Sequence, residues 1–153
     1  LQLKTLTDAG FSVKTLGYKN PLIDIKFSGE EITLEQLTKL ADVGENITWL
    51  SLSGTNVQDK WISVVSKFPN LTRLELQKTG VSDEAVAYLS VLEHLESLNL
   101  YGTNVTDSCL PILSEISRLK RVYLWNTKVT QNNVKALQKA NNGLEVLIGV
   151  SSN

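Results

Sequence analysis

The sequence predicts an α/β solenoid in which short parallel strands form a concave face, helices form the convex face and an N-terminal cap closes one end. The first observation is a constant interval, because four threonines recur with a 24-residue period and each is followed two positions later by a valine. The threonines are Thr55, Thr79, Thr103 and Thr127, and the valines are Val57, Val81, Val105 and Val129. Such a period is typical of repeat proteins, in which each unit buries its apolar face against its neighbours.

The second observation is an alternation of apolar and polar residues early in each period. Leu74 and Leu76 alternate with polar or charged residues at 73, 75 and 77. Successive side chains of a strand point to opposite faces. The alternation therefore predicts a short strand with its leucines inside and its polar side chains outside.

The third observation is helical spacing in the second half of each period. Val86, Leu89 and Leu92 follow this spacing. Ser82 and Asp83 precede them and predict a helix start, with a capping hydroxyl and an acid in the first turn. Because every unit supplies a strand and then a helix, the strands should stack in parallel on one face and the helices should cover the other.

The spacing inside one period carries a family resemblance. The repeat of residues 71–81 reads Leu-x-x-Leu-x-Leu-x-x-Thr-x-Val, and its leucine spacing returns from Ile47, Leu95 and Leu119. These segments resemble leucine-rich repeats. The asparagine or cysteine that usually follows the strand in that family is threonine here. A threonine hydroxyl can take the same role by bonding to backbone groups where the chain turns.

The resemblance divides the chain into three parts within one domain. We expect residues 1–46 to form an N-terminal cap and a degenerate first repeat, residues 47–142 to form four 24-residue repeats, and residues 143–153 to form a terminal strand and tail.

Within the cap, Leu3 and Leu6 predict a short helix that ends near Gly10, and Phe11 and Val13 alternate as in a strand. An uncovered terminal unit of a solenoid exposes apolar surface, so atypical sequence is expected at this end.

The repeats beside the four regular ones are irregular. The degenerate first repeat begins at Leu22, which is one position further from Ile47 than the regular period, and Glu30 stands at its threonine position. At the other end Leu144 and Leu147 predict a last strand. We expect the edge beyond that strand to be uncovered.

Composition and charge narrow the classes of partner. The chain has 153 residues, of which 42% are hydrophobic, which is enough for one continuous core. No apolar run approaches the roughly 18 residues that span a bilayer. The formal net charge is −1, which argues against nucleic acid or an anionic membrane surface as a partner.

The predicted strands, placed side by side, give three rows of outward positions. The first row is Trp49, Arg73, Ser97, Arg121 and Val146; the second is Ser51, Glu75, Asn99, Tyr123 and Ile148; the third is Ser53, Gln77, Tyr101, Trp125 and Val150. Neighbours in a row lie about 4.8 Å apart. Tyr101 should therefore touch Trp125, and Tyr123 should lie against Ile148.

Aromatic and arginine side chains gather toward one end of these rows, and these residue types are enriched at binding hot spots. The candidate binding residues are Tyr101, Arg121, Tyr123, Trp125, Arg73 and Trp49. Two interpretations remain open. The cluster is either a binding patch or an apolar edge that packs against a further repeat.

Trp49 lies apart from the cluster, near the other end of the same face. We expect its ring to pack against Arg73, which is a structural role.

Catalytic and metal chemistry have no clear residues in this sequence, and no cofactor is expected. His94, the single histidine, falls in a turn where a solvated role is expected. Cys109, the single cysteine, falls on a predicted helix and reads as a packing thiol. Asp59, Asp83 and Asp107 recur with the same period as the threonines. Their place at predicted helix starts favours capping over calcium binding.

Longer stretches of the repeat support a resemblance to a narrower group of proteins. The stretches Leu-Ser-Gly-Thr-Asn-Val from Leu52, Leu-Tyr-Gly-Thr-Asn-Val from Leu100, and Val-Tyr-Leu-Trp-Asn-Thr-Lys-Val-Thr from Val122 resemble bacterial repeat modules, notably those of Bacteroidetes and Planctomycetes. In such proteins a similar module can follow a membrane-anchored region with a c-type cytochrome domain. The resemblance implies a periplasmic or cell-envelope location, which cysteine usage leaves open. The haem motif Cys-x-x-Cys-His is absent from this chain.

Two functions follow as hypotheses. The first is a non-catalytic module that recognises a protein or another ligand through its concave face. The second is an assembly or spacer domain of a larger membrane-anchored cytochrome or cell-envelope protein, because the chain begins with leucine rather than methionine. The expected partners are a separate protein or other domains of the same longer chain, with self-association through the uncovered edge as a further possibility.

Overall fold

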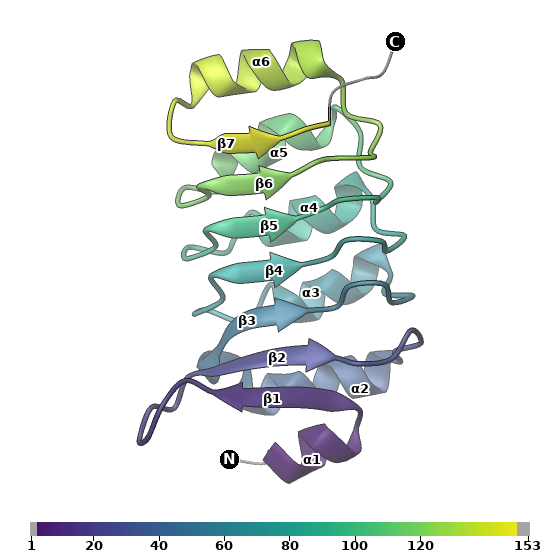
Figure 1. The fold of residues 1–153 in the computed structure, drawn as a ribbon, viewed down its shortest axis with the longest axis vertical. Coiled ribbons are helices and arrows are strands. Elements are labelled where there is room, and N and C mark those ends of the chain that lie inside the picture. The colour runs from purple at the N-terminus through teal and green to yellow at the C-terminus, as the bar shows by residue number, and fades with distance from the viewer. Residues whose placement is uncertain (1–2, 150–153) are drawn as a thin grey trace.

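The computed structural model describes residues 3–149 and contains one seven-stranded sheet whose strands lie in sequence order (Figure 1). The strands are β1 (Phe11–Thr15), β2 (Ile23–Phe27), β3 (Ile47–Ser51), β4 (Arg73–Glu75), β5 (Ser97–Asn99), β6 (Arg121–Tyr123) and β7 (Glu145–Leu147). The α-helices are α1 (Leu3–Asp8), α2 (Leu34–Thr38), α3 (Ile62–Val65), α4 (Asp83–Leu89), α5 (Cys109–Glu115) and α6 (Gln131–Ala140), and two 3-10 helices are η1 (Lys39–Asn46) and η2 (Asp59–Trp61).

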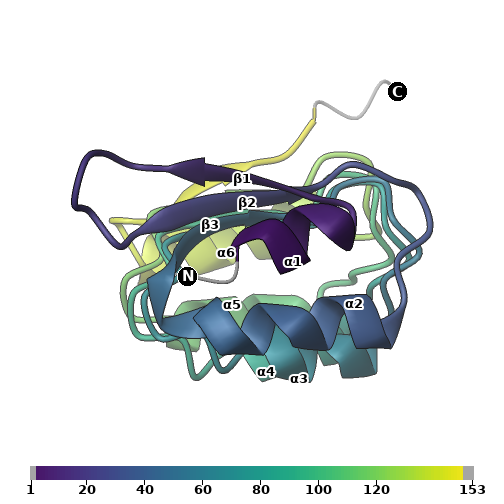
Figure 2. The ribbon, with the colours of Figure 1, turned by 90° about the horizontal axis from the view of Figure 1, so that it is seen from below.

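The solenoid prediction is confirmed. Strands β2 to β7 pair in parallel, and Leu50, Leu74, Leu98 and Val122, each one repeat after the last, stand beside one another. Each of these four side chains is at most 1% exposed. The helices α2 to α5 lie together on one face of the sheet (Figure 2), so the core is a single layer of apolar side chains between strands and helices.

The N-terminal cap adds a strand of opposite direction. The expected helix and strand are present as α1 and β1, but β1 pairs with β2 in antiparallel fashion. Residues 16–22 between them are too few for the crossover that parallel strands require. Phe11 and Phe27 face each other across this pair, with ring centroids 5.2 Å apart in an edge-on arrangement. The cap thus places aromatic rings over the open end of the core.

The longer spacing of the first repeat produces a local irregularity. Ile23 pairs with Ile47, which is one regular period later, whereas Asp24 pairs with Trp49, which is one position beyond that period. The extra residue, Thr48, is accommodated by a shift of register at this point. The one-residue excess in the spacing from Leu22 to Ile47 thus corresponds to a register shift between β2 and β3.

The prediction for the last strand was wrong by one position. Glu145, and not Val146, lies beside Arg121, and Val146 stands beside Val122 in the core with 8% exposure. Gly143 stands one full period after Leu119, so the buried leucine comes one position late, as Leu144. The outward positions predicted for the last strand were counted from Leu144, so each of them was one residue too far along the chain.

The neighbours of Tyr123 change with this correction. Tyr123 lies beside Leu147, whereas Ile148 packs against the core. Val150, predicted for the third row, lies outside the described residues.

The recurring threonines close the turn after each strand. Their hydroxyls donate to backbone carbonyls earlier in the same turn, at 2.7 Å in all four repeats. The donor and acceptor pairs are Thr55 with Leu52, Thr79 with Leu76, Thr103 with Leu100, and Thr127 with Leu124. The predicted role of the threonine hydroxyl is thus confirmed.

The same turn contains a backbone position of positive φ, directly before each threonine. The residues and their φ angles are Gly54 at 70°, Lys78 at 57°, Gly102 at 66° and Asn126 at 54°. This left-handed conformation suits glycine and is tolerated by asparagine, but it is costly for lysine.

The aspartates do not cap their own helices, contrary to the prediction. The carboxylate of Asp83 accepts hydrogen bonds from the backbone N–H and the hydroxyl of Thr106, which belongs to the next repeat. Asp59 makes the same two bonds to Ser82, and Asp107 makes them to Thr130. The hydroxyl of Ser82 is consequently not used to cap α4. Because equivalent helix starts lie side by side, each acid joins consecutive units.

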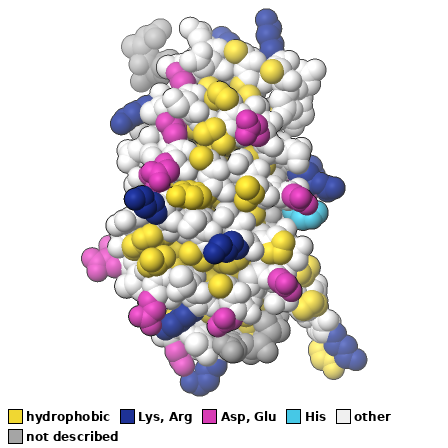
Figure 3. All heavy atoms as spheres, turned by 180° about the vertical axis from the view of Figure 1, so that it is seen from behind, with side chains coloured by type: hydrophobic (Ala, Val, Ile, Leu, Met, Phe, Trp, Pro, Cys, Tyr) yellow, Lys and Arg dark blue, Asp and Glu magenta, His cyan; other side chains and the backbone are white. Residues whose placement is uncertain are grey.

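The helix-bearing side of the molecule carries dispersed charges and small apolar areas (Figure 3). Trp61, Val64, Tyr88 and Ile112 are partly buried there and pack against the core. None of the helices within residues 3–149 is both long and apolar enough to cross a bilayer.

Candidate binding face

The outward side chains of β3 to β7 form a continuous surface, which we call the sheet face. Its two rows within the strands are Trp49, Arg73, Ser97, Arg121 and Glu145, and Ser51, Glu75, Asn99, Tyr123 and Leu147. The inward side chains of each strand form the core, whereas the outward side chains do not, so the outward residues are free to differ from repeat to repeat.

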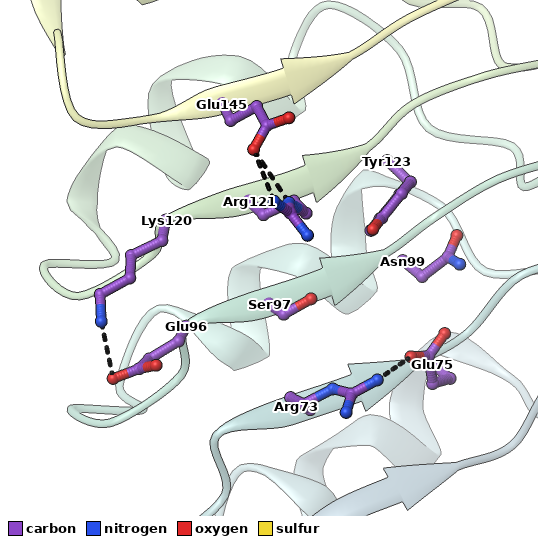
Figure 4. A pocket seen from close by; sticks show the side chains of 9 residues that line it. All are labelled: Arg73, Glu75, Glu96, Ser97, Asn99, Lys120, Arg121, Tyr123 and Glu145. Carbon is purple, nitrogen blue, oxygen red and sulfur yellow. Dashed lines mark hydrogen bonds and ion pairs between the residues drawn. The ribbon is translucent and has the colours of Figure 1, made fainter.

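A hollow of about 630 Å³ lies in the middle of the sheet face (Figure 4). We call it the charged hollow. Its lining residues are Arg73, Glu75, Glu96, Ser97, Asn99, Lys120, Arg121, Tyr123 and Glu145. The short side chains of Ser97 and Asn99 on β5 form its floor between longer side chains on β4 and β6.

Three ion pairs surround this hollow, and two of them join neighbouring repeats. Lys120 Nζ lies 3.2 Å from Glu96. Arg121 contacts Glu145 through both Nε and a terminal nitrogen, each at 2.9 Å. The bond to Glu145 raises the pKa of Arg121 above its ordinary value.

These charges are accessible to a partner. The side chain of Arg121 is 49% exposed and that of Lys120 is 69% exposed. Exposed ion pairs are screened by water and contribute little to folding. A partner can therefore replace one member of a pair at a small cost in stability.

Arg73 and Trp49 form the contact that the sequence predicted. The guanidinium carbon of Arg73 lies 5.9 Å from the centroid of the Trp49 ring, a cation–π arrangement. Arg73 also approaches Glu75 at 3.6 Å. Arg73 thus connects Trp49 to the charged hollow.

The predicted aromatic cluster is divided between separate places. Tyr123 lines the charged hollow, whereas Trp125 lines a second hollow of about 620 Å³ with Ile148 and Gly149. Trp125 is 53% exposed. A side chain on Gly149 would come within 3.2 Å of the Trp125 ring, so this ring lies directly against the backbone of Gly149.

The third aromatic residue, Tyr101, stands one repeat before Trp125, and the backbones of the two turns are hydrogen-bonded. The N–H of Gly102 donates to the carbonyl of Trp125 at 2.9 Å. Within residues 3–149, however, the only two aromatic rings that stack or meet edge-on are those of Phe11 and Phe27. The rings of Tyr101 and Trp125 do not form the expected aromatic contact.

Sequence reasoning missed most of the charged residues around the hollow. Glu96 and Lys120 stand one full period apart, as do Arg121 and Glu145. Opposite charges separated by one repeat are the signal that could have found them, since residues at this interval lie side by side.

The two residues considered for catalysis lie in unsuitable surroundings. His94 is exposed in the turn before β5. Cys109 is fully buried, and burial together with the charges of Asp83 and Asp107 raises its pKa to about 12. The thiol is therefore protonated at neutral pH and is a poor nucleophile. Within the described part of the chain, no group of three or more histidine, cysteine or acidic residues is arranged to hold a metal ion.

Comparison with known proteins places the fold. No protein-family model matches the sequence, and no curated protein matches it. Among solved structures, internalin C2 from Listeria monocytogenes matches with a TM-score of 0.57 and 23% identity, over 73% of this chain and 46% of that protein. An internalin designated inlF, from the same organism, gives 0.55 and 20% over 76% and 32%.

A third structure is the segment of leiomodin-1 described as its actin-binding site 2, with a TM-score of 0.57 and 12% identity over 79% of this chain and 82% of that segment. At these identities the likeness concerns the fold, which is that of a leucine-rich repeat solenoid. The chain spans less than half the length of the two internalins.

Proposed function

We propose that this chain is a non-catalytic recognition module that binds a protein partner through the sheet face. The observation that carries the proposal is the charged hollow, whose side chains come from consecutive repeats and are not required by the core. The leucine-rich repeat fold supports it, because proteins of this fold are generally interaction modules.

The chemistry of the charged hollow indicates the kind of surface that it fits. Three basic side chains, at 73, 120 and 121, alternate with acidic side chains at 75, 96 and 145. Such a surface selects a partner with a complementary arrangement of both charges, since like charges placed opposite one another are costly. Tyr123 adds a rigid aromatic group beside Arg121.

Site-specific photo-crosslinking tests the proposal. A benzophenone amino acid replaces Tyr123 on the sheet face, and in a matched control it replaces Tyr88 on helix α4. We expect a protein of the source cells to be crosslinked from position 123 and not from position 88. Equal crosslinking from both positions would argue against the sheet face as the binding surface.

The partner found in this way allows a quantitative test. Arg121→Ala should weaken binding about tenfold or more in calorimetry, as is usual for a central arginine. Lys135→Ala, on the exposed side of α6, should leave the affinity unchanged. Unchanged affinity of the Arg121 variant would contradict the proposed role of the charged hollow.

A second candidate function is assembly through the end of the array. It is favoured by the exposed ring of Trp125 beside Ile148 at the last described strand. Sedimentation velocity should then show self-association that Trp125→Ser abolishes. A monomer at all concentrations would exclude assembly between copies of this chain.

A further inference from the structure

A separate hollow of about 460 Å³ lies toward the N-terminal half of the sheet face, and we call it the polar hollow. Its wall includes Trp49, Ser51 and Ser53 from β3 and the turn that follows it. Glu75 and Gln77, from β4 and the turn that follows it, complete that wall, and residues 28–30 after β2 form the rim. The volume falls in the range of small-molecule sites in proteins.

The carboxylate of Glu75 lacks hydrogen-bond donors within the described structure. Its side chain is only 15% exposed, and its nearest cation, Arg73, lies 3.6 Å away. That separation allows electrostatic attraction but is too long for a hydrogen bond. The carboxylate oxygens are not among the enclosed unpaired atoms, so they face open space from which water or a bound molecule can donate to them.

Three neighbouring polar groups in the same wall are also unpaired among the described residues. The indole nitrogen Nε1 of Trp49 and the amide oxygen Oε1 of Gln77 are enclosed without a hydrogen-bond partner. Ser51 is 4% exposed, and its hydroxyl makes no side-chain hydrogen bond within residues 3–149. Buried polar groups in folded proteins are nearly always paired. The two enclosed exceptions, with Glu75 and Ser51 beside them in one hollow, favour a place that a bound molecule completes.

The unpaired groups define the chemistry of that molecule. It must donate hydrogen bonds to Glu75 and to the amide oxygen of Gln77 and accept one from Trp49, while Ser51 can do either. A hydroxyl group both donates and accepts. Two adjacent hydroxyls can donate to the two oxygens of one carboxylate.

The charges around the polar hollow exclude a strongly ionic ligand. Glu75 lies 3.6 Å from Arg73, and the lining residues include one base, Lys26, and one further acid, Glu30. An ion would gain little from this balanced set and would lose its hydration. The wall is therefore suited to a neutral molecule.

We infer that the polar hollow binds a neutral saccharide unit, with vicinal hydroxyls on the carboxylate of Glu75 and a further hydroxyl between Ser51 and Gln77. Contact with the enclosed atoms of Trp49 and Gln77 requires these side chains to change rotamer. This site shares the side chain of Glu75 with the charged hollow, but it does not depend on the protein partner proposed above.

Nuclear magnetic resonance tests the inference directly. The chain has three tryptophans, and the indole N–H signal of Trp49 is assigned by its loss in Trp49→Phe. Glucose, galactose, mannose and N-acetylglucosamine are added to the ¹⁵N-labelled protein up to about 50 mM, which detects millimolar dissociation constants. At least one of these sugars should shift the Trp49 signal in a saturable manner and leave those of Trp61 and Trp125 in place.

Two matched variants distinguish the site from a general effect. Glu75→Gln keeps the size of the side chain but removes the charged acceptor, and it should weaken sugar binding at least tenfold. Glu96→Gln, on the same face outside the polar hollow, should bind as the unmodified protein does. The backbone amide spectrum of each variant shows whether the fold is retained.

Three results would overturn the inference. One is the absence of any shift with all four sugars, which means that water satisfies the wall. Another is equal binding by the Glu75 and Glu96 variants. The third is a shift caused by N-acetylasparagine amide and by none of the sugars, which would identify an amide group as the ligand. Failure of the crosslinking test at Tyr123 leaves all of these measurements unaffected.

Discussion

The turn after each strand shows how a single residue affects the conformational strain of a repeat. Gly54 and Gly102 occupy its left-handed position without penalty, and Asn126 is tolerated there. Lys78 adopts the same conformation with a φ of 57°. The second repeat therefore carries a backbone strain that the first and third do not.

Relief of that strain should stabilise the protein. Lys78→Gly should raise the free energy of unfolding by about 0.5–1 kcal/mol, because the left-handed conformation costs an L-residue about 1–2 kcal/mol and the greater freedom of glycine in the unfolded chain offsets part of the gain. Urea denaturation measures the change.

Gly54→Ala is the reciprocal control. A side-chain carbon at Gly54 would meet no atom within 4 Å, so any loss reports the backbone alone. We expect a loss of about 1 kcal/mol. A lower stability of Lys78→Gly, or an unchanged stability of Gly54→Ala, would contradict this account.

Single residues also set the limit of what the sequence could predict about the binding face. The contact between Arg73 and Trp49 was predictable, since the two residues stand one repeat apart on adjacent strands. The unpaired carboxylate of Glu75 was not, because the donors available to a side chain depend on rotamers and on neighbours in other repeats.

At the scale of the elements, the junction between successive helix starts is held by the aspartates. Asp107 accepts from the backbone N–H and hydroxyl of Thr130 and from the side-chain amide of Asn133. The backbone bond from Thr130 contributes most to lowering the pKa of Asp107 below its ordinary value of 3.8. The charged form of this acid therefore favours the folded state.

This linkage predicts a pH dependence of stability. An acid whose pKa is lower in the folded protein stabilises that state above its ordinary pKa, and the contribution is lost as pH falls through the folded value. Asp107→Asn should therefore be less stable than the unmodified protein near pH 6, and the difference should shrink as pH falls below 3.8. Denaturation curves recorded between these conditions measure it.

Asp42 provides the control for this experiment. It is exposed, and its side chain accepts no hydrogen bond within residues 3–149, so Asp42→Asn should differ little from the unmodified protein at any pH. A stability gap for the Asp107 variant that stays constant or widens on acidification would show that the carboxylate acts by another route.

The elements were largely predictable because strands and helices impose different spacings of apolar residues. The strand at 73–75 and the helix at 83–89 lie where Leu74, Val86 and Leu89 indicate. The bonds of the aspartates were assigned wrongly, since an acid at a helix start has the same local sequence whether it caps its own helix or bonds to the next one. Local sequence does not distinguish a partner in the same helical turn from a partner in the next repeat.

At the scale of the whole molecule, each unit contacts mainly the units beside it, so stability should be local along the array. Phe11 in the cap and Val146 in the last described strand are both buried, at 2% and 8% exposure. They stand at opposite ends of the sheet.

Hydrogen exchange should reveal this independence. Phe11→Ala should accelerate amide exchange in α1, β1 and β2 and leave β6 and β7 unchanged, whereas Val146→Ala should have the opposite distribution. The two variants serve as controls for each other. Accelerated exchange over the entire sheet in either variant would show that the molecule unfolds as one cooperative unit.

The overall architecture followed from the constant period of the sequence, since any regular stack of strand and helix units must place equivalent residues side by side. The ends were less predictable. At β7 a glycine replaced the expected leucine and displaced the count, and at β1 the direction of the strand depended on the length of the turn that joins it to β2. The period predicts the structure of the repeated units, but it does not predict the structure of the irregular sequence on either side of them.

The bonds between aspartates and the following repeat have a consequence for engineering. Each junction is directional, because one unit supplies the carboxylate of Asp83 and the next supplies the donors of Thr106. A duplicated cassette of residues 83–106 would carry both halves of that junction in the correct order. The protein could thus be lengthened by whole modules, gaining a longer surface for recognition while its original ends stay intact.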